Sequence, residues 1–400
     1  MTHKGFRRYI LAILFLLVVV NCDNEQKKHL KETKGQENTP ITFDLKNLKK
    51  TSDVKLSDLG VVDIKYIPLE TKQNSMMGEI YDLKADDHFL FINSAGKIQR
   101  YSFDGSYMTQ IGREGKGVGE YQFGKDFSFD RNGRVYVLSM HEDKIYIYSP
   151  QGKFIRTIPC PKTSTKLCCM DSNILCFSEN AGGFVINSFD IINYDGKTLK
   201  SFPNKFKFKV GENPGLLMNE CASFRSEGQL YVKEVSSDTV FVYKDRDLNP
   251  AFILDDGGKS MPPEKRHWNS FEEFKKITLE YISVRRLLKF GNYIYYAFML
   301  GYDGYIFIGS VNGGHQFLTN IKHGIINDLD GGPNIWFETT KNDHTIISWI
   351  NTYELKAYVT SDAFKNSTPK YPQKKKELEK LANSLSENDN PVLMLIKLKE

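Results

Sequence analysis

The sequence predicts an all-β fold in which a unit of four short strands is repeated around a ring. Of its 400 residues, 40% are hydrophobic and 26% are charged, as in folded soluble chains. The aromatic residues, 21 Tyr and 27 Phe but 3 Trp, stand in short β-rich runs rather than in helical stripes. The second strand of each predicted unit starts at residue 89, 134, 174, 229, 293 or 334. This recurrence predicts a six-bladed β-propeller of four-stranded antiparallel blades.

The clearest blade spans residues 126–159. Its strands read DFSFD (126–130), RVYVLS (134–139), KIYIYS (144–149) and FIRTIP (154–159). Short polar turns such as Pro150-Gln151-Gly152 separate these runs. Four strands in this succession form one antiparallel blade.

The remaining blades show the same succession of short strands and polar turns. They are expected at residues 79–111, 166–202, 223–254, 282–320 and 325–350. The last of these starts with IINDLD (325–330), NIWFETT (334–340) and HTIISWI (344–350), so it still needs a strand from elsewhere in the chain.

Two helical insertions interrupt the pattern. Residues 262–281 follow Pro262-Pro263 and carry Trp268, Phe271, Phe274 and Ile277 at helical spacing. Residues 371–387 carry Leu378, Leu381 and Leu385 at helical spacing. Both segments are predicted to form short helices outside the blades.

The chain ends in an apolar strand. PVLMLIKLK (391–399) is too hydrophobic for a loose tail. We expect it to complete the last blade together with ITFDL (41–45), which would close the ring and give a propeller over residues 41–400.

The N-terminus predicts export. A basic stretch, Met1 to Arg8, precedes an apolar run from Tyr9 to Val20. As a helix, that run would be about 18 Å long, shorter than the roughly 30 Å hydrocarbon core of a membrane. Residues 1–21 are therefore interpreted as a signal peptide rather than a permanent span.

Cys22 follows the apolar run directly. The sequence Val18-Val19-Val20-Asn21-Cys22 resembles a bacterial lipobox, although Asn21 replaces the usual small residue. The resemblance implies a lipid on Cys22 that anchors the protein in a membrane of the cell envelope. The alternative is an ordinary secreted protein with an incidental cysteine. Residues 22–40 are polar and predict a flexible tether.

The charge pattern argues against nucleic acid as a partner. The formal net charge of +5 arises from 54 Lys and Arg residues against 49 Asp and Glu residues. These charges are dispersed along the chain, and no localised basic face stands out.

The cysteines after Cys22 are odd in number, and none forms a C-x-x-C pair. They are interpreted as buried thiols, with one disulfide as the alternative. They are Cys160, Cys168, Cys169, Cys176 and Cys221.

Several stretches resemble two known families. Residues 112–154 resemble an NHL repeat, with a glycine-rich turn leading into two strands. YIPLET (66–71), GVGEY (117–121), NDLDGG (327–332) and DNPVLMLIKLK (389–399) are similar to six-bladed β-propeller lipoproteins of Gram-negative bacteria. This resemblance implies the fold, export and an outer-membrane position, but no defined activity.

The closely spaced Gly112, Gly115, Gly117 and Gly119 could suggest a phosphate cradle. No Gly-Lys-Ser/Thr follows, and the segment leads into a strand rather than a helix. We interpret these glycines as a structural repeat turn.

A metal site is a second hypothesis, with calcium or zinc as the ion; no other cofactor is evident. Asp328 and Asp330 offer hard oxygen ligands, although an Asp-Gly turn explains them more simply. His141, His315 and His344 lie near predicted loops and could contribute to a metal in a central channel.

Three residues are candidates for ligand binding. Arg285 and Arg286, at the start of the fifth blade, could meet an anionic ligand. Trp268 offers an aromatic surface on the first helical insertion.

Two functions from different classes follow. The preferred one is a lipid-anchored binding or scaffold module for a glycan, a peptide or a partner protein, because the sequence lacks a catalytic motif. The alternative is a metal-dependent lyase or hydrolase with its site in the central channel.

Overall fold

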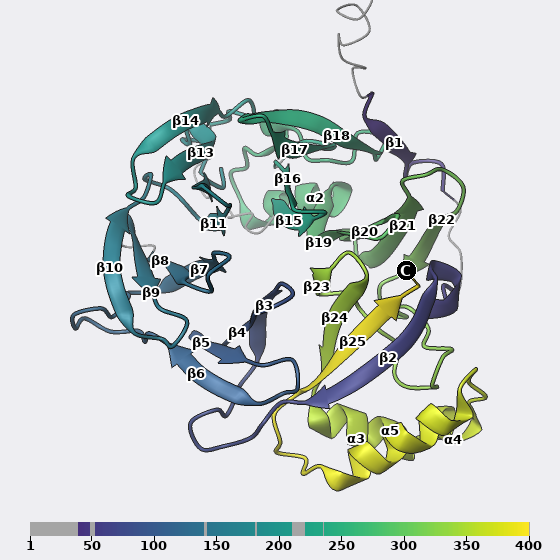
Figure 1. Ribbon diagram of the computed structural model, residues 1–400. Helices are drawn as coiled ribbons and strands as arrows, with labels where there is room; N and C mark the ends of the chain where they lie inside the picture. Colours follow the sequence, from purple (N-terminus) through teal and green to yellow (C-terminus); the bar gives the residue numbers. More distant parts are fainter. Residues whose placement is uncertain are drawn as a thin grey trace, which may run out of the picture. The chain divides into compact units, whose positions relative to one another are not determined.

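Six four-stranded antiparallel sheets are arranged in a ring, which confirms the predicted β-propeller (Figure 1). The computed structural model describes residues 39–48, 53–139, 142–180, 182–209, 221–234 and 236–399. Residues from Ile41 onward form one unit. The predicted signal peptide (residues 1–21), Cys22 and nearly all of the predicted tether lie outside the described residues.

The first five blades follow the predicted order, from an inner to an outer strand. Blade one contains β3 (Ile80–Ala85), β4 (Leu90–Ser94), β5 (Lys97–Tyr101) and β6 (Tyr107–Ile111). Blade two contains β7 (Gly124–Phe129), β8 (Val135–Ser139), β9 (Lys144–Tyr148) and β10 (Phe154–Pro159). Blade three contains β11 (Lys166–Cys169), β12 (Asn173–Phe177), β13 (Asn187–Asn193) and β14 (Thr198–Pro203). Blade four contains β15 (Ala222–Ser226), β16 (Gln229–Lys233), β17 (Thr239–Lys244) and β18 (Asp247–Asp255). Blade five contains β19 (Ile282–Phe290), β20 (Tyr293–Leu300), β21 (Asp303–Ser310) and β22 (Gln316–Asn320).

Blade six differs from the prediction in its first strands. It contains β23 (Thr339–Asn342), β24 (Thr345–Ile350), β25 (Val392–Leu398) and, outermost, β2 (Val61–Pro68). Residues 325–330 and most of 334–340, predicted as strands, form a loop with isolated bridges. The reason is a buried turn, in which Asp330 accepts hydrogen bonds from Asn327 Nδ2 (2.6 Å) and the Gly332 N–H (2.8 Å).

The closing role of the C-terminal strand is confirmed, but the prediction for ITFDL is wrong. β1 (Ile41–Asp44) pairs in parallel with β18 and forms a fifth strand of blade four. Phe43 is buried there, with its ring 6.2 Å from that of Phe252 and 5.6 Å from that of Phe307 in blade five. Packing between blades four and five therefore selects the partner of β1.

Short helices occupy both predicted insertions. The first holds the 3-10 helix η2 (Pro263–Lys265) and α2 (Phe271–Glu280), whose N-cap Ser270 accepts a hydrogen bond from the Glu273 N–H (3.1 Å). The second holds α5 (Pro372–Ser384). Two further helices, α3 (Thr352–Thr360) and α4 (Asp362–Asn366), precede α5 and share a small buried core with it. A further 3-10 helix, η1 (Leu56–Leu59), precedes β2.

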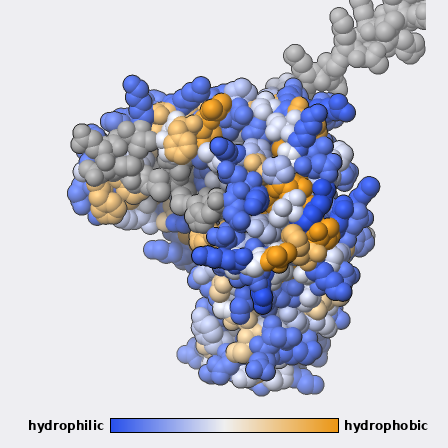
Figure 2. All heavy atoms as spheres, turned by 90° about the vertical axis from the view of Figure 1, so that its left-hand side faces the viewer, coloured by the Kyte–Doolittle hydropathy of each residue, from blue (hydrophilic) through white to orange (hydrophobic). Residues whose placement is uncertain are grey.

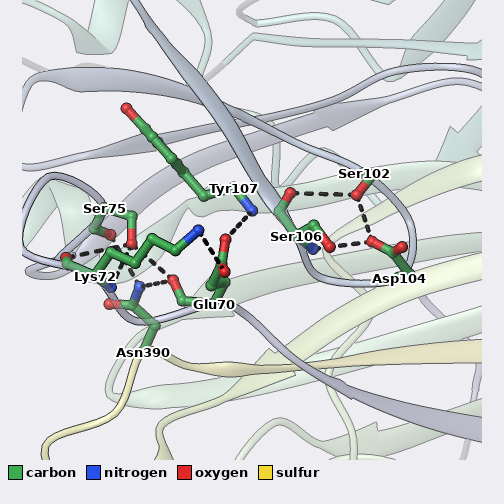
Figure 3. A network of polar contacts seen from close by, with 8 residues as sticks. All are labelled: Glu70, Lys72, Ser75, Ser102, Asp104, Ser106, Tyr107 and Asn390. Carbon is green, nitrogen blue, oxygen red and sulfur yellow. Dashed lines mark hydrogen bonds and ion pairs between the residues drawn. The ribbon is translucent and has the colours of Figure 1, made fainter.

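A polar network joins blade six to blade one (Figure 3). Asn390, just before β25, donates to the backbone oxygens of Glu70 (2.8 Å) and Ser75 (2.9 Å). The Glu70 carboxylate accepts a hydrogen bond from the N–H of Tyr107 in β6 (3.0 Å). The chain end thus fixes the connection that starts blade one.

The blades present two different faces. Because the strands alternate in direction, the first link of every blade and the third link of blades one to five lie at one end of the strands. These links are tight turns, and we call this end the turn face. The second link and the connection to the next blade lie at the other end, which we call the insertion face. Its longer described or partly described segments are 69–79, 112–123, 178–186, 204–221, 256–281, 321–338 and 351–391.

Candidate functional site

Six inner strands, β3, β7, β11, β15, β19 and β23, surround the middle of the ring (Figure 1). Neighbouring blades flank each of these strands. Water therefore reaches their side chains from the central channel and its two mouths, and the exposed residues of inner strands line a candidate ligand site.

One side of the channel holds paired charges. Lys84 in blade one lies 2.6 Å from Asp126 in blade two and 3.5 Å from Asp82. Burial disfavours the charged amine, but the two carboxylates outweigh this effect and raise the pKa of Lys84. These groups hold blades one and two together.

A second pair joins blades five and six. Arg286 lies 2.5 Å from Glu338, which precedes β23. Burial raises the pKa of Glu338, and Arg286 opposes that shift. The predicted ligand residue Arg286 is thus engaged by a neighbouring blade.

The other side of the channel, in blades three to five, is richer in unpaired positive charge. Arg285 in β19 and Arg225 in β15 are both exposed, and within the described residues neither has an ion pair with a carboxylate. Arg225 contacts the Cys168 side chain of β11. Lys166 donates to the backbone oxygen of Cys221 (3.1 Å). The sequence analysis identified Arg285 but missed Arg225.

A small polar pocket lies beneath the insertions of blades three and four. Its lining includes the buried side chains Asn180, Asn204, Glu234 and Arg266. Burial lowers the pKa of Arg266 to about 10, while Glu179 opposes the shift; burial also raises the pKa of Glu234. Arg266 Nη1 donates to the Asn180 backbone oxygen (3.4 Å), which ties the two insertions together.

Trp268 lies inside the first helical insertion. Its side chain is buried, and its ring lies 5.0 Å from that of Phe274 in α2. Its indole N–H has no hydrogen-bond partner among the described residues. The structure thus places Trp268 in the core of the insertion.

The glycine-rich segment forms a closed turn between blades one and two. Glu120 accepts hydrogen bonds from the Gly117 N–H (2.8 Å) and from Arg113 Nε. Gly112 and Gly119 have positive φ values of 55° and 75°. Gly115 completes the turn by donating to the Tyr121 backbone oxygen (3.1 Å).

The candidate metal ligands do not converge. His315 and His344 are exposed in tight turns on the turn face, whereas Asp328 and Asp330 lie in the 321–338 segment of the insertion face. Asp328 accepts hydrogen bonds from the Ser57 N–H (3.1 Å) and hydroxyl (2.6 Å). His141 lies outside the described residues.

No group of three or more His, Cys, Asp or Glu side chains is placed to share a metal ion in the part of the chain that the structure describes. The cysteines from Cys160 to Cys221 are free thiols. Burial raises the pKa of both Cys160 and Cys221 to about 12.

Exposed hydrophobic side chains separate into two sets. Those of the outer strands of blades one to three stand in small groups on a largely hydrophilic side of the ring (Figure 2). Every exposed large hydrophobic residue that lies outside a strand, among those described, belongs to the insertion face. These residues are Met76, Val118, Phe123, Phe184, Ile186, Phe271, Tyr302, Trp336, Tyr353 and Tyr371. Within the described residues, no helix combines the length and apolar character needed to cross a membrane.

Comparisons with known proteins identify the fold and the family. No curated protein matches the sequence. A solved structure from Bacteroides fragilis NCTC 9343, provisionally described as an exported protein, is 17% identical with a TM-score of 0.67; the match covers 90% of this chain and 100% of that one. A member of the DUF4221 family from Bacteroides vulgatus ATCC 8482 is 11% identical with a TM-score of 0.50, over 85% of this chain and 97% of that one. Both share the fold. The family model described as a domain of unknown function, DUF4934, matches residues 40–397, and the chain therefore belongs to that family.

Proposed function

We propose that this protein is an exported, lipid-anchored binding module that holds a glycan on its insertion face and in the channel beneath it. The observation that carries the proposal is that the exposed hydrophobic residues outside the strands, among those described, all belong to the insertion face. Exposed hydrophobic residues gathered on one face are typical of binding surfaces, and the segments between strands commonly carry function.

Aromatic rings beside polar groups suit a sugar. Tyr302 and Phe184 are 81% and 72% exposed, and each belongs to a link between the second and third strands of a blade. Their faces can cover the apolar face of a sugar ring, while nearby hydroxyl and amide groups can bond its hydroxyls.

The experiment is a glycan array probed with the full mature chain. We expect replacement of Phe184, Phe271 and Tyr302 by Ala to weaken binding of the captured glycan at least tenfold. The matched control replaces three exposed hydrophobic residues of outer strands, Met108, Phe154 and Leu199, by Ala. Equal loss in both variants, or capture of peptides or a partner protein in place of glycans, contradicts the proposal.

Export and lipidation are supported by the N-terminal pattern and by the description of the Bacteroides fragilis protein. Two acyl chains on Cys22 would hold the protein stably at a membrane. We expect the wild-type chain to incorporate labelled palmitate and fractionate with membranes, and the Cys22→Ser variant to do neither. A labelled Cys22→Ser variant contradicts the anchor.

A further inference from the structure

A Ser-x-Arg element occurs twice on the inner strands of adjacent blades. β15 carries Ser223 and Arg225 on either side of Phe224, and β19 carries Ser283 and Arg285 on either side of Val284. In β15, whose pairing with β16 is regular, Ser223 shares a side with Arg225 because side chains alternate along a strand. In β19 the register with β20 shifts between Val284 and Arg286, so Arg285 lies at a β-bulge, and its exposure rather than strand alternation places it at the channel. The intervening Phe224 and Val284 are buried, while both arginines are exposed.

The two elements lie next to each other. β15 and β19 pack directly against one another around the channel. Blades four and five therefore bring two exposed guanidiniums, each close in sequence to a serine hydroxyl, to one side of the channel. A guanidinium offers several donors in a planar fork, and a hydroxyl adds a further donor.

The charges of this sector are not neutralised in the way that other channel charges are. Lys84 has carboxylates on both sides, and Arg286 has Glu338. Within the described residues, Arg225 and Arg285 have no ion pair with a carboxylate, and Arg225 contacts the Cys168 side chain instead.

Lys166 adds a third positive group near this sector. It lies on β11 and is bonded to the Cys221 backbone oxygen, which carries no charge. Three positive side chains thus lie on neighbouring inner strands of blades three, four and five, and a cluster of positive groups attracts anions.

We propose that the two Ser-x-Arg elements form an oxyanion-binding site in the channel, which takes the carboxylate or sulfate group of an acidic saccharide. Two guanidiniums can each make paired hydrogen bonds to the oxygens of such a group, and charge-assisted bonds of this kind are the strongest polar contacts available. The proposal rests on the proposed function, because it assigns the chemical class of the glycan.

The lining of the inner strands favours a saccharide over a peptide. Hydroxyl groups from Ser223, Ser283, Thr339 and Thr340 accompany the charged residues. Tyr81 is the one exposed large hydrophobic residue among the described inner strands. A peptide would need apolar subsites here, whereas a polyol with an acid group needs hydroxyl partners and charge.

The test measures binding to the full mature chain by isothermal titration calorimetry at constant ionic strength. The probes are trigalacturonic acid, its uncharged methyl ester, and sodium sulfate. The variants are Arg225→Gln, Arg285→Gln and the double variant. Arg131→Gln is the control, because Arg131 is also exposed, lies on the turn face and changes the net charge equally.

We expect the wild type and the Arg131 variant to bind trigalacturonic acid, each single channel variant to bind it at least tenfold more weakly, and the double variant to lose binding. Arg225→Lys should bind more tightly than Arg225→Gln but more weakly than the wild type, because lysine keeps the positive charge but lacks the planar, forked donors of the guanidinium. Circular dichroism and the midpoint of thermal unfolding would verify that each variant is folded.

The three probes distinguish a saccharide acid group from a free anion as the ligand. They also distinguish failure of the oxyanion site from failure of the proposed function. Binding of sulfate but not of trigalacturonic acid, lost in the double variant, would identify a free-anion site and overturn the saccharide assignment. Equal binding of acid and methyl ester, or unchanged binding in the double variant, overturns the oxyanion site but leaves the glycan module standing. A positive glycan array without any acidic glycan has the same meaning, whereas an array without any glycan overturns the proposed function itself.

Discussion

The turn face and the insertion face are built from opposite ends of the same strands, yet they are constrained very differently. On the turn face, glycines in the links before the outer strands pack against the preceding blade: Gly105 against Pro68, Gly152 against Gln110, and Gly196 against Pro159. The outer strands run around the circumference of the ring, so the end of each one reaches the next blade (Figure 1). Among the described residues, the glycines of the insertion-face segments show no such repeated approach to the preceding blade.

This difference separates the links that fix one blade against the next from the segments that are free to vary in length and sequence. On the turn face, a side chain added at one of these glycines would have to displace the backbone of the preceding blade. Segments of the insertion face can lengthen, acquire helices and expose aromatic rings without disturbing the strands below them.

The largest expected effect comes from two glycines with the same backbone conformation. Gly152 on the turn face and Gly258 on the insertion face both have φ of 79°. A Cβ at Gly152 would overlap the Gln110 carbonyl oxygen, whereas a Cβ at Gly258 meets no atom within 4 Å. Gly258→Ala should lower the free energy of unfolding by about 1 kcal/mol through left-handed strain alone. Gly152→Ala should lower it by about 3 kcal/mol or more.

Urea-induced unfolding of the two variants measures this difference. If both variants lost the same free energy of unfolding, the backbone around Gly152 would accommodate a methyl group without cost. The proposed difference between the two faces would then be wrong.

The next effect compares two buried lysines. Lys289, near the turn-face end of β19, lies 2.5 Å from Glu227, whereas Lys233, at the insertion-face end of β16, has no ion pair within the described residues. Lys289→Met should destabilise the protein by about 1 kcal/mol, because the buried Ser226 loses its partner while the exposed Glu227 can be solvated by water. Lys233→Met should stabilise it by about 2 kcal/mol at pH 7, since burial of its charge is removed. Thermal unfolding of both variants tests the opposite signs.

Lys233 also predicts a pH dependence. Burial lowers the pKa of Lys233 to about 8 from an ordinary value of 10.5. Between these values the unfolded chain binds more protons at this position than the folded chain, so the free energy of unfolding rises with pH. Lys233→Met should lose this contribution between about pH 8 and 10.5. A wild-type and variant difference that stays constant over this range contradicts the assignment.

The smallest expected effect concerns the exposed aromatic residues. Phe184→Ser and Tyr302→Ser should change the free energy of unfolding by less than about 0.5 kcal/mol, because both side chains are largely in solvent. Denaturant titration checks this expectation. Destabilisation by more than about 1 kcal/mol would mean that these rings hold the insertions together and would weaken the binding proposal.

The sequence was sufficient to predict the strands of blades one to five. In a run such as KIYIYS, the regular succession of β-forming residues between polar turns predicts a strand, and β9 lies where it was expected. Blade six shows the limit of this signal. Ile325, Ile335 and Phe337 are buried as strand residues would be, but a loop buries them, with Asn327 and Asp330 satisfying its polar groups.

Pairing partners and site geometry were beyond the sequence pattern. ITFDL was correctly predicted to pair in a blade, but its partner β18 depends on the space that Gly309 leaves for the Phe43 ring. Arg225 could have been found by noticing that Ser-x-Arg occurs twice at the start of a blade. The missed helix α3 has Tyr, Val and Thr residues, whose helix propensity is weak.

The pairing of β2 with β25 has a consequence for how the chain folds during synthesis. Residues 61–68 are made early, but their partner at residues 392–398 is made last. Until then, an outer strand rich in Val and Ile has an unpaired edge and must avoid pairing with other nascent chains. The contact order of this closure is high, so joining blade six should be the slow step of folding. A chain that terminates before β25 would therefore keep the strands of blades one to five but could not pair β2 with β24 through β25, and the ring would stay open.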